Sequence, residues 1–262
     1  MIDIHAHVLP GVDDGPEDWQ GSLELLRMAV EDGIGGAVCT SHVLDQLSAS
    51  LEKEYTRKFT ELKERIRETG IQIDLWLGSE IHCFSRFDVS SPLATFDGNG
   101  KYLLVEFSMG EIPAQPMHLF RHLQEQGVTP ILAHPERNAV LMQKPDRAKE
   151  FVEGGVLMQV NSGSLTGVFG RRSQSAAQRM IEEGMIHFVA SDGHGTRSRP
   201  MRMQDAFVAV KEEWGEETAR TLFFDNPRRA IAGEPIFSPQ LVPAESGKKR
   251  GGGWKRSLFK KG

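Results

Sequence analysis

Cysteine is scarce in this chain: of its 262 residues, only Cys39 and Cys83 carry a thiol. Two cysteines cannot form a disulfide framework, so a reducing compartment is the simpler expectation. The first residues lack the basic and apolar stretches of a secretory signal, and no apolar run approaches the roughly 20 residues that span a bilayer. We therefore expect a cytoplasmic protein.

Positive charge is also scarce over most of the chain. Residues 248–262 hold seven Lys and Arg and no acid, so removing them from the 31 basic residues leaves 24 against 36 acidic ones. A body this acidic is a poor general binder of nucleic acid, and we expect no such partner. The tail interleaves its charges with Trp254, Leu258 and Phe259. This composition suits contact with the inner membrane surface or a disordered solubilising end.

The remaining sequence alternates between strand-like and helix-like segments, which predicts an α/β domain with a parallel sheet. Seven strands are expected at 2–5, 36–40, 71–77, 101–107, 129–133, 156–160 and 186–190. The first helix is expected to begin near Asp14-Gly15-Pro16-Glu17 and to close at Gly33. No glycine-rich dinucleotide fingerprint follows any strand, which favours a closed barrel over an open sheet. We assign 1–242 to this barrel and 243–262 to a basic, disordered tail.

Polar side chains that bind metals follow the ends of these strands. His5 and His7 are two residues apart, so in an extended chain both imidazoles point to one face and can reach one ion. In a barrel the carboxyl ends of the strands face one another, and polar residues placed there converge. Each residue alone is equally compatible with a structural histidine, a solvated carboxylate or a helix cap. The recurrence favours one metal site built from His5, His7, Asp14, His42, Glu80, Glu106, His134, Asp192 and His194.

Five segments carry a resemblance to a known family. They are MIDIHAHVLPGVDDGP at the start, GSEI (78–81), AHPERN (133–138), QVNSGSLTG (159–167) and ASDGH (190–194). Together they resemble the polymerase-and-histidinol-phosphatase (PHP) superfamily, and within it the capsule and exopolysaccharide tyrosine-protein phosphatases of bacteria (the CpsB/CapC/YwqE-like family). The likeness runs in order from Met1 to about Gly233.

The resemblance implies a distorted TIM-like (β/α)7 barrel of the PHP type that holds three divalent metal ions. Manganese is the expected metal, with iron or zinc as alternatives, and the ligand positions fall on the nine residues above. The catalytic arginines of the family correspond to Arg137 and Arg199. Imidazole and carboxylate donors without thiolate agree with these metals rather than with a closed structural zinc site.

Other phosphatase chemistries lack their residues here. A cysteine-dependent phosphatase needs an arginine six residues after its cysteine, but Asp45 stands at that spacing from Cys39 and Val89 from Cys83. No GxSxG elbow or P-loop occurs either. We interpret both cysteines as packing residues.

The sequence departs from its relatives near the expected site. Ser41 stands where proline is common, and Gly193 and Gly195 flank His194 where alanine and asparagine are frequent. The stretch 43–50 is expected to line the entrance, although it bears little likeness to the usual sequence. Substrate identity is therefore less firmly implied than metal binding.

Several further polar residues have more than one interpretation. Asn161, Ser162 and Ser164 follow the sixth strand, where they can bind substrate or support a ligand by hydrogen bonding. We favour a structural role for the remaining histidines over ligation: His82 beside Glu80, an exposed helix pair at His118 and His122, and a core position for His187.

The leading hypothesis is therefore a metal-dependent protein-tyrosine phosphatase that acts on a bacterial tyrosine kinase linked to polysaccharide export. A small-molecule phosphatase of the histidinol-phosphate type shares the same ligands. A non-catalytic metal-binding module that regulates a partner is the alternative from another class. The sequence leaves open whether the chains form a homo-oligomer.

Overall fold

The computed structural model describes residues 1–83 and 89–238, so the predicted tail at 243–262 lies outside the described residues. Every strand pair in this part of the chain is parallel. The strands are β1 (Ile2–Ala6), β2 (Gly36–Cys39), β3 (His42–Val43), β4 (Asp74–Leu77), β5 (Glu80–His82), β6 (Tyr102–Glu106), β7 (Thr129–Ala133), β8 (Leu157–Asn161) and β9 (Phe188–Ala190).

The strands form two sheets, ordered β1-β2-β4 and β3-β5-β6-β7-β8-β9, that join into one ring. The amide of Gly78 donates to the carbonyl of Cys39 at 3.0 Å, so the pairing of β2 with β4 leads into that of β3 with β5. On the other side, Ala6 pairs with Gly193, just beyond β9. The ring thus has seven strand positions, two of them broken by a kink. This confirms the distorted (β/α)7 barrel, while β3 and β5 were not predicted as separate strands.

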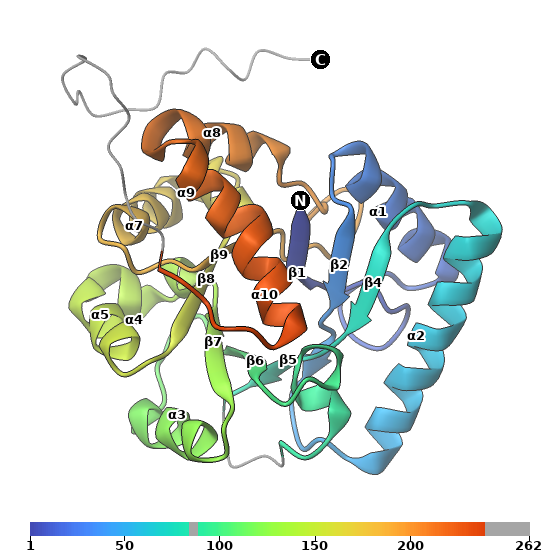
Figure 1. Ribbon diagram of the computed structural model, residues 1–262, viewed down its shortest axis with the longest axis horizontal. Coiled ribbons are helices and arrows are strands. Elements are labelled where there is room, and N and C mark those ends of the chain that lie inside the picture. Colours follow the sequence, from blue (N-terminus) through green and yellow to red (C-terminus); the bar gives the residue numbers. More distant parts are fainter. Residues whose placement is uncertain (84–88, 239–262) are drawn as a thin grey trace.

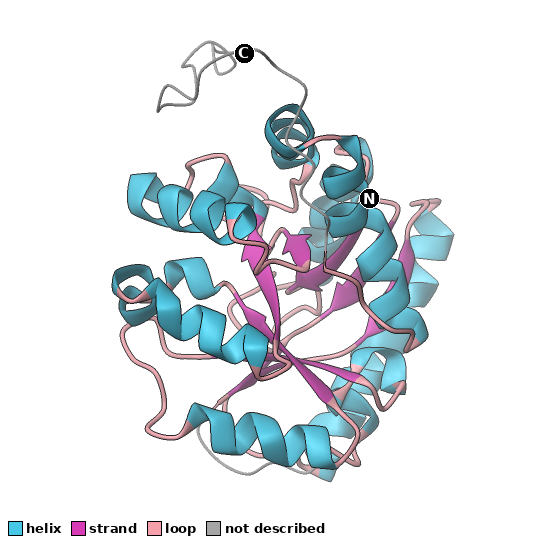
Figure 2. Ribbon diagram, turned by 60° about the vertical axis from the view of Figure 1, so that its left-hand side comes forward, coloured by secondary structure: helices cyan, strands magenta, loops and turns pink. Residues whose placement is uncertain are grey.

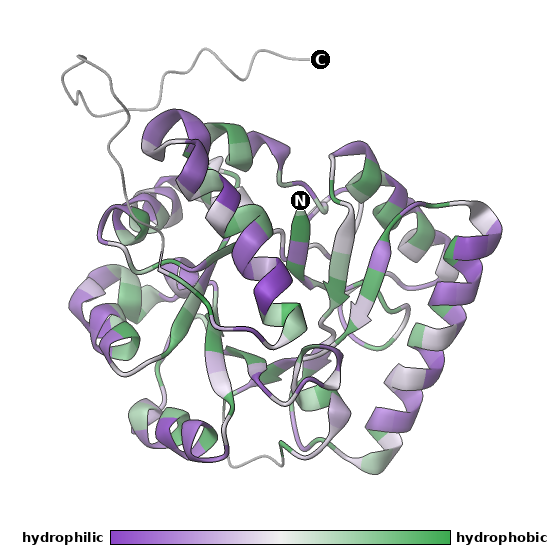
Figure 3. Cartoon of the chain, viewed as in Figure 1, coloured by the Kyte–Doolittle hydropathy of each residue, from purple (hydrophilic) through white to green (hydrophobic). Residues whose placement is uncertain are grey.

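Helices surround this ring (Figures 1 and 2). In Figure 3 the strands are largely apolar, whereas the outer helices alternate between apolar and polar residues, as expected for helices packed on one face. No helix in the described ranges is both long enough and apolar enough to cross a bilayer. The helices are α1 (Trp19–Glu31), α2 (Ala49–Thr69), α3 (Pro116–Glu125), α4 (Ala139–Gln143), α5 (Pro145–Glu153), α6 (Ser162–Leu165), α7 (Gly170–Glu182), α8 (Gln204–Trp214), α9 (Glu216–Arg220) and α10 (Asn226–Ala232).

The first helix begins later than predicted. It starts at Trp19, and the carboxylate of Asp18 caps it by accepting from the amide of Gly21 at 2.8 Å. The residues before it form a loop, because the carboxylate of Asp13 accepts from the amide of Gly15 at 3.0 Å and also contacts the ring of His7. The prediction of a helix start at Asp14–Glu17 was wrong, since this segment is held at the strand ends instead.

Helix α10 covers the amino-terminal end of the barrel (Figure 1). The side-chain amide of Asn99, which precedes β6, donates to the carbonyl of Ala230 at 2.7 Å, and the hydroxyl of Tyr102 donates to that of Glu234 at 2.6 Å. Ala230 also joins the apolar cluster formed by Ile4, Val38, Phe96, Tyr102, Leu104, Ile131, Ala133, Phe188 and Ala190. With the amino-terminal end covered in this way, the carboxyl ends of the strands are left to carry polar side chains.

Candidate metal centre

All nine predicted ligand residues lie at the carboxyl ends of the strands, or just beyond them. His5 and Glu106 belong to the ends of β1 and β6, while His42 and Glu80 begin the short strands β3 and β5. The remaining five stand in the loops that follow β1, β7 and β9: His7, Asp14, His134, Asp192 and His194. The kinks after β2 and β4 matter here, because each is followed directly by a ligand position.

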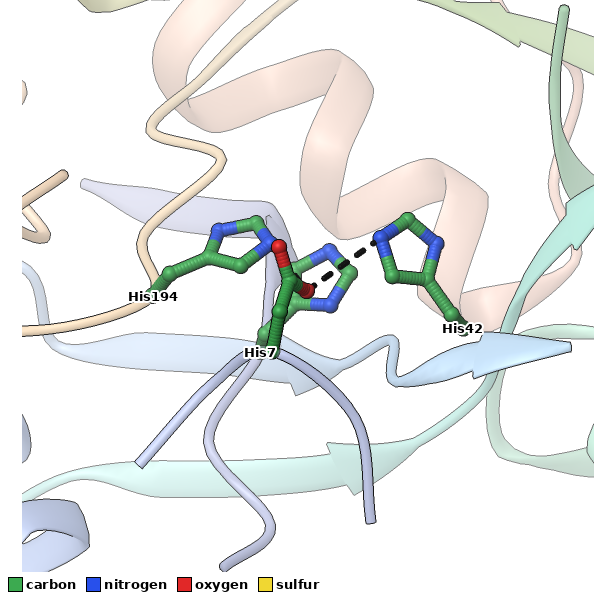
Figure 4. A group of neighbouring side chains, drawn as sticks. His7, His42 and His194 are labelled. Carbon is green, nitrogen blue, oxygen red and sulfur yellow. Dashed lines mark ion pairs between the residues drawn. The ribbon is translucent and has the colours of Figure 1, made fainter. Parts of the chain in front are cut away.

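Seven of these side chains form three overlapping groups, and within each group the donor atoms lie within 4.8 Å of one another. The groups are His7, Asp14, His42 and His194; His5, His7 and Glu80; and His42, Glu80 and Glu106. The rings of the first group turn toward one another (Figure 4), and the centroids of His7 and His194 are 3.7 Å apart. Every pair of groups shares a residue, so the three groups form one continuous cluster.

His134 and Asp192 border these groups. The Nε2 atom of His134 is 3.1 Å from Oε1 of Glu80, and Oδ1 of Asp192 is 3.5 Å from Nε2 of His5. Both residues are buried. Their donor atoms therefore lie within reach of the same centre, and all nine predicted positions are gathered together.

Buried atoms without a well-formed hydrogen bond test whether the site fits metal ions. Among the described residues there are five such side-chain atoms, and three of them belong to the groups above: Nδ1 of His42, Oε2 of Glu80 and Nε2 of His194. Each of the three lies about 3.1 Å from another candidate ligand, with which it makes an ion-pair contact but no well-aligned hydrogen bond. Buried polar atoms are usually satisfied within a protein, because an unpaired one costs desolvation energy. Lone pairs directed at a shared centre meet the requirement of divalent cations, so the residues fit a metal cluster.

The protonation of the metal-free cluster also agrees with metal binding. Burial opposes ionisation of Glu80, but His5, His134 and His7 hold its pKa well below the usual range. Burial also favours a neutral His5, yet Glu80 and Asp192 raise the pKa of its imidazole to about 9. Protons thus neutralise carboxylates that a divalent ion would neutralise instead, and metal binding must release them.

Two residues that orient the ligands were missed in the sequence. Asp13 accepts from the ring Nδ1 of His7 at 2.8 Å and from the backbone amide of His42 at 3.0 Å. Oε1 of Gln159 lies 2.9 Å from Nδ1 of His5. Each contact leaves the Nε2 atom of its histidine facing the cluster.

The signals for these two residues differ. The paired carboxylates at positions 13 and 14 could have suggested Asp13. Gln159 gives no such signal, because it lies within β8 rather than at its end.

The two predicted arginines line the same cavity as the ligands, which has a volume of about 1010 Å³. Nη1 of Arg137 donates to Oδ2 of Asp192 at 2.8 Å, and the guanidinium stacks 4.1 Å above the ring of Phe169. Nη2 of Arg199 donates to Oδ2 of Asp14 at 2.5 Å. Both guanidiniums are therefore held beside the cluster by its own carboxylates.

The predicted substrate-binding residues are buried, and each of their side chains donates to the protein. Asn161 donates to Oδ2 of Asp192 at 2.8 Å and Ser162 to the carbonyl of Arg202 at 2.6 Å. Ser164 donates to Oε1 of Glu136 at 2.6 Å. These hydrogen bonds agree with a role in supporting neighbouring residues. Direct contact of the three residues with substrate stays a prediction.

The other predicted features near the site have clear positions. Val43, Leu44, Asp45, Gln46 and Ser48 line the cavity, as expected for the 43–50 stretch. A β-carbon at Gly193 would lie 2.3 Å from the Cγ of Met201, which explains the absence of alanine there.

The remaining histidines agree with the roles favoured above. His82 contacts Oε1 of Glu106 through Nδ1 at 3.1 Å and belongs to none of the three groups. His118 and His122 are exposed on α3, and His187 is buried.

Both cysteines are buried, Cys39 in β2 and Cys83 just after β5. Burial raises the pKa of each thiol to about 12, so neither supplies a thiolate near neutral pH. The interpretation of both as packing residues agrees with this environment.

Comparison with known proteins places this geometry in a family. The chain is 32% identical to the tyrosine-protein phosphatase YwqE of Bacillus subtilis, over 94% of this chain and 97% of YwqE. It is 31% identical to the tyrosine-protein phosphatase CpsB of Streptococcus pneumoniae, over 90% of this chain and all of CpsB.

Solved structures agree. A structure from work on YwqE and CpsB, described as unique metal-dependent tyrosine phosphatases, matches with a TM-score of 0.84 and 32% identity over 92% of this chain and 99% of that chain. A phosphotriesterase homology protein of Escherichia coli, 11% identical with a TM-score of 0.57, shares the fold. Residues 1–232 match the model of the family described as capsular polysaccharide synthesis, CpsB/CapC, and the chain belongs to that family.

Proposed function

We propose that this protein is a metal-dependent phosphatase that hydrolyses phosphotyrosine in a protein substrate. The proposal rests on the convergence of nine imidazole and carboxylate side chains on one cluster, six of which line a cavity together with two guanidiniums. The names of its relatives YwqE and CpsB support the choice of phosphotyrosine.

We further propose three divalent ions, with manganese as the expected metal and iron or zinc as alternatives. When bound, such ions supply an ionised water as nucleophile at neutral pH and polarise the phosphoryl oxygens. Three divalent ions against the carboxylates of Asp14, Glu80, Glu106 and Asp192 leave a charge of about +2. This charge suits a phosphomonoester dianion.

The side chains of this chain have distinct roles in the proposed reaction. Arg137 and Arg199 bind the non-bridging oxygens and stabilise the charge that develops on them. Asp192 and Asp14 hold these two guanidiniums in place. Asn161 fixes Asp192 in turn, so the arginine and the ligand are oriented by one hydrogen-bonded unit.

The expected partner is a phosphorylated tyrosine kinase of the bacterial capsule or exopolysaccharide system, in the cytoplasm. The description of the family as capsular polysaccharide synthesis supports this choice. The seven basic residues at 248–262 suggest contact with anionic lipid, which would bring the enzyme to the inner membrane surface. Liposome sedimentation of the full chain beside a chain ending at residue 247 tests this contact, and equal binding contradicts it.

Hydrolysis assays with metal-loaded protein test the proposed activity. We expect faster turnover of a phosphotyrosine peptide than of histidinol phosphate. Chelation should abolish this activity, and added Mn²⁺ should restore it. Arg137→Ala should lower kcat by about a hundredfold or more while the bound metal is retained. Turnover that resists chelation would contradict the mechanism, and preference for histidinol phosphate would contradict the substrate.

A further inference from the structure

The cavity that contains the ligands also has apolar walls. Within the described ranges, four large hydrophobic side chains are exposed, and two of them, Leu44 at 65% and Met109 at 41%, line this cavity. Val12, Leu51 and Phe107 extend the apolar lining. An exposed leucine and methionine at the entrance of an otherwise charged site offer apolar surface that a ligand can cover.

The topology places Leu44 and Met109 on two sides of one strand. Leu44 follows β3 directly, Met109 comes three residues after β6, and β5 lies between these strands. Strands two positions apart are separated by roughly 10 Å between their backbones. Leu44 and Met109 therefore border the cavity from opposite sides of β5, and the part of the cavity between them is called the slot.

From this arrangement we propose that Leu44 and Met109 are specificity-determining residues that select aryl over alkyl phosphomonoesters. The inference rests on the proposed phosphatase function and adds the residues that recognise the leaving group. With the phosphate at the ligands and arginines, the aromatic ring lies between the leucine and the methionine. The thioether of Met109 adds a favourable contact with an aromatic ring.

The same walls disfavour an alkyl phosphate. A phosphoserine side chain has a single methylene between its backbone and the ester oxygen, so it cannot fill the slot. Its peptide backbone would have to approach the charged groups Asp14, His42 and Asp45, which also line the cavity. Apolar burial is thus available to the aryl ester alone.

Binding of non-hydrolysable analogues to the full-length, Mn²⁺-loaded protein tests the inference without relying on turnover. Calorimetry should show that phenylphosphonate binds at least tenfold more tightly than methylphosphonate. Leu44→Ser and Met109→Ser should each remove most of this preference and leave methylphosphonate affinity unchanged. Phe237→Ser is the matched control, because Phe237 is 56% exposed and lies outside this cavity, and it should leave both affinities unchanged.

Kinetics with phosphotyrosine and phosphoserine peptides of the same flanking sequence provide the second arm. Each variant should lower kcat/KM for the phosphotyrosine peptide about tenfold, mainly through KM, with no loss for the phosphoserine peptide. An unaltered phenyl preference, or equal weakening of both phosphonates, would overturn the inference. If the analogues behave as expected while the wild-type protein hydrolyses neither peptide, the proposed function fails and the aryl selectivity stands.

Discussion

The two ends of the barrel both bury polar side chains, but they satisfy them in different ways. At the amino-terminal end, Nδ1 of His187 accepts from the amide of Met158 at 3.2 Å, and Asn226 donates to the carbonyls of His187 and Phe237 at 2.9 and 2.8 Å. At the carboxyl end, buried atoms of His42, Glu80 and His194 make no well-aligned hydrogen bond and contact only other candidate ligands, at about 3.1 Å.

This difference separates stability from function within one fold. Hydrogen bonds that close the amino-terminal end help to hold α10 against the strands and leave little for a ligand to gain. The carboxyl end retains unsatisfied donors and acceptors at a cost in folding free energy, which a bound ligand offsets. Changes at the two ends should therefore have opposite consequences for activity and stability.

The largest effect is expected from His42→Ala at the carboxyl end. His42 belongs to two of the three candidate metal groups, so its loss should reduce bound metal and lower kcat/KM by more than about a hundredfold. Nδ1 of His42 contacts carboxylate oxygens of Glu80 and Glu106 at 3.1 Å, so metal-free protein should lose only about 1 to 2 kcal/mol of unfolding free energy. Metal analysis and urea titration measure both quantities. Normal activity with a large loss of stability would show that His42 serves stability rather than function, which would contradict the prediction.

At the amino-terminal end, the expected effect is on the pH dependence of stability. Burial lowers the pKa of His187 to about 4, whereas the unfolded chain has the usual value near 6.5. Between these values the unfolded state binds more protons, so this contribution to stability is complete above pH 6.5 and is lost as the pH falls toward 4.

The unfolding free energy of metal-free protein should fall by about 2 kcal/mol more between pH 7.5 and 5 than that of His187→Gln. Urea titrations at the two pH values measure this difference, since all other titrating groups are common to both proteins. Identical pH dependence would show that His187 is not buried in its neutral form.

A smaller effect is expected from Phe169, which stacks on Arg137. Phe169→Leu keeps an apolar side chain but removes the ring face, so kcat should fall by about five- to tenfold with unchanged metal content. Phe169→Tyr retains the stacking surface and should recover most of the activity. Equal loss in both variants would indicate a packing role alone.

The smallest effect is expected at the cysteines. Cys39→Ser and Cys83→Ser should change kcat/KM by less than about twofold, because both thiols are buried, protonated and outside the metal groups. Steady-state kinetics before and after thiol alkylation provide the measurement. Inactivation by either substitution would mean that a cysteine takes part in the chemistry.

Much of the barrel could be predicted from the sequence, because hydrophobic runs alternate with helical patterns. The strands containing Ile4, Leu104, Ile131 and Val160 were found at nearly their observed bounds. Short segments were missed. Strand β3 has two residues and β5 has three, which are too few to show an alternating hydrophobic pattern. The start of α1 was misplaced because a tertiary contact, from Asp13 to the ring of His7, overrides a favourable local pattern.

The site was likewise predicted only in part. Ligand candidates at strand ends could be placed, because the parallel topology brings those ends together. The partners that orient them could not, since Gln159 lies within a strand and meets His5 only after the barrel closes. The aromatic support of Arg137 by Phe169 likewise depends on where the loop after α6 packs.

Anomalous diffraction from crystals grown with Mn²⁺ would locate the bound metal. We predict manganese peaks among the three overlapping groups that contain His7, His42 and Glu80, and none at the amino-terminal end near His187. Crystals that show no manganese among these side chains, together with protein that retains no transition metal under any loading condition, would contradict this prediction.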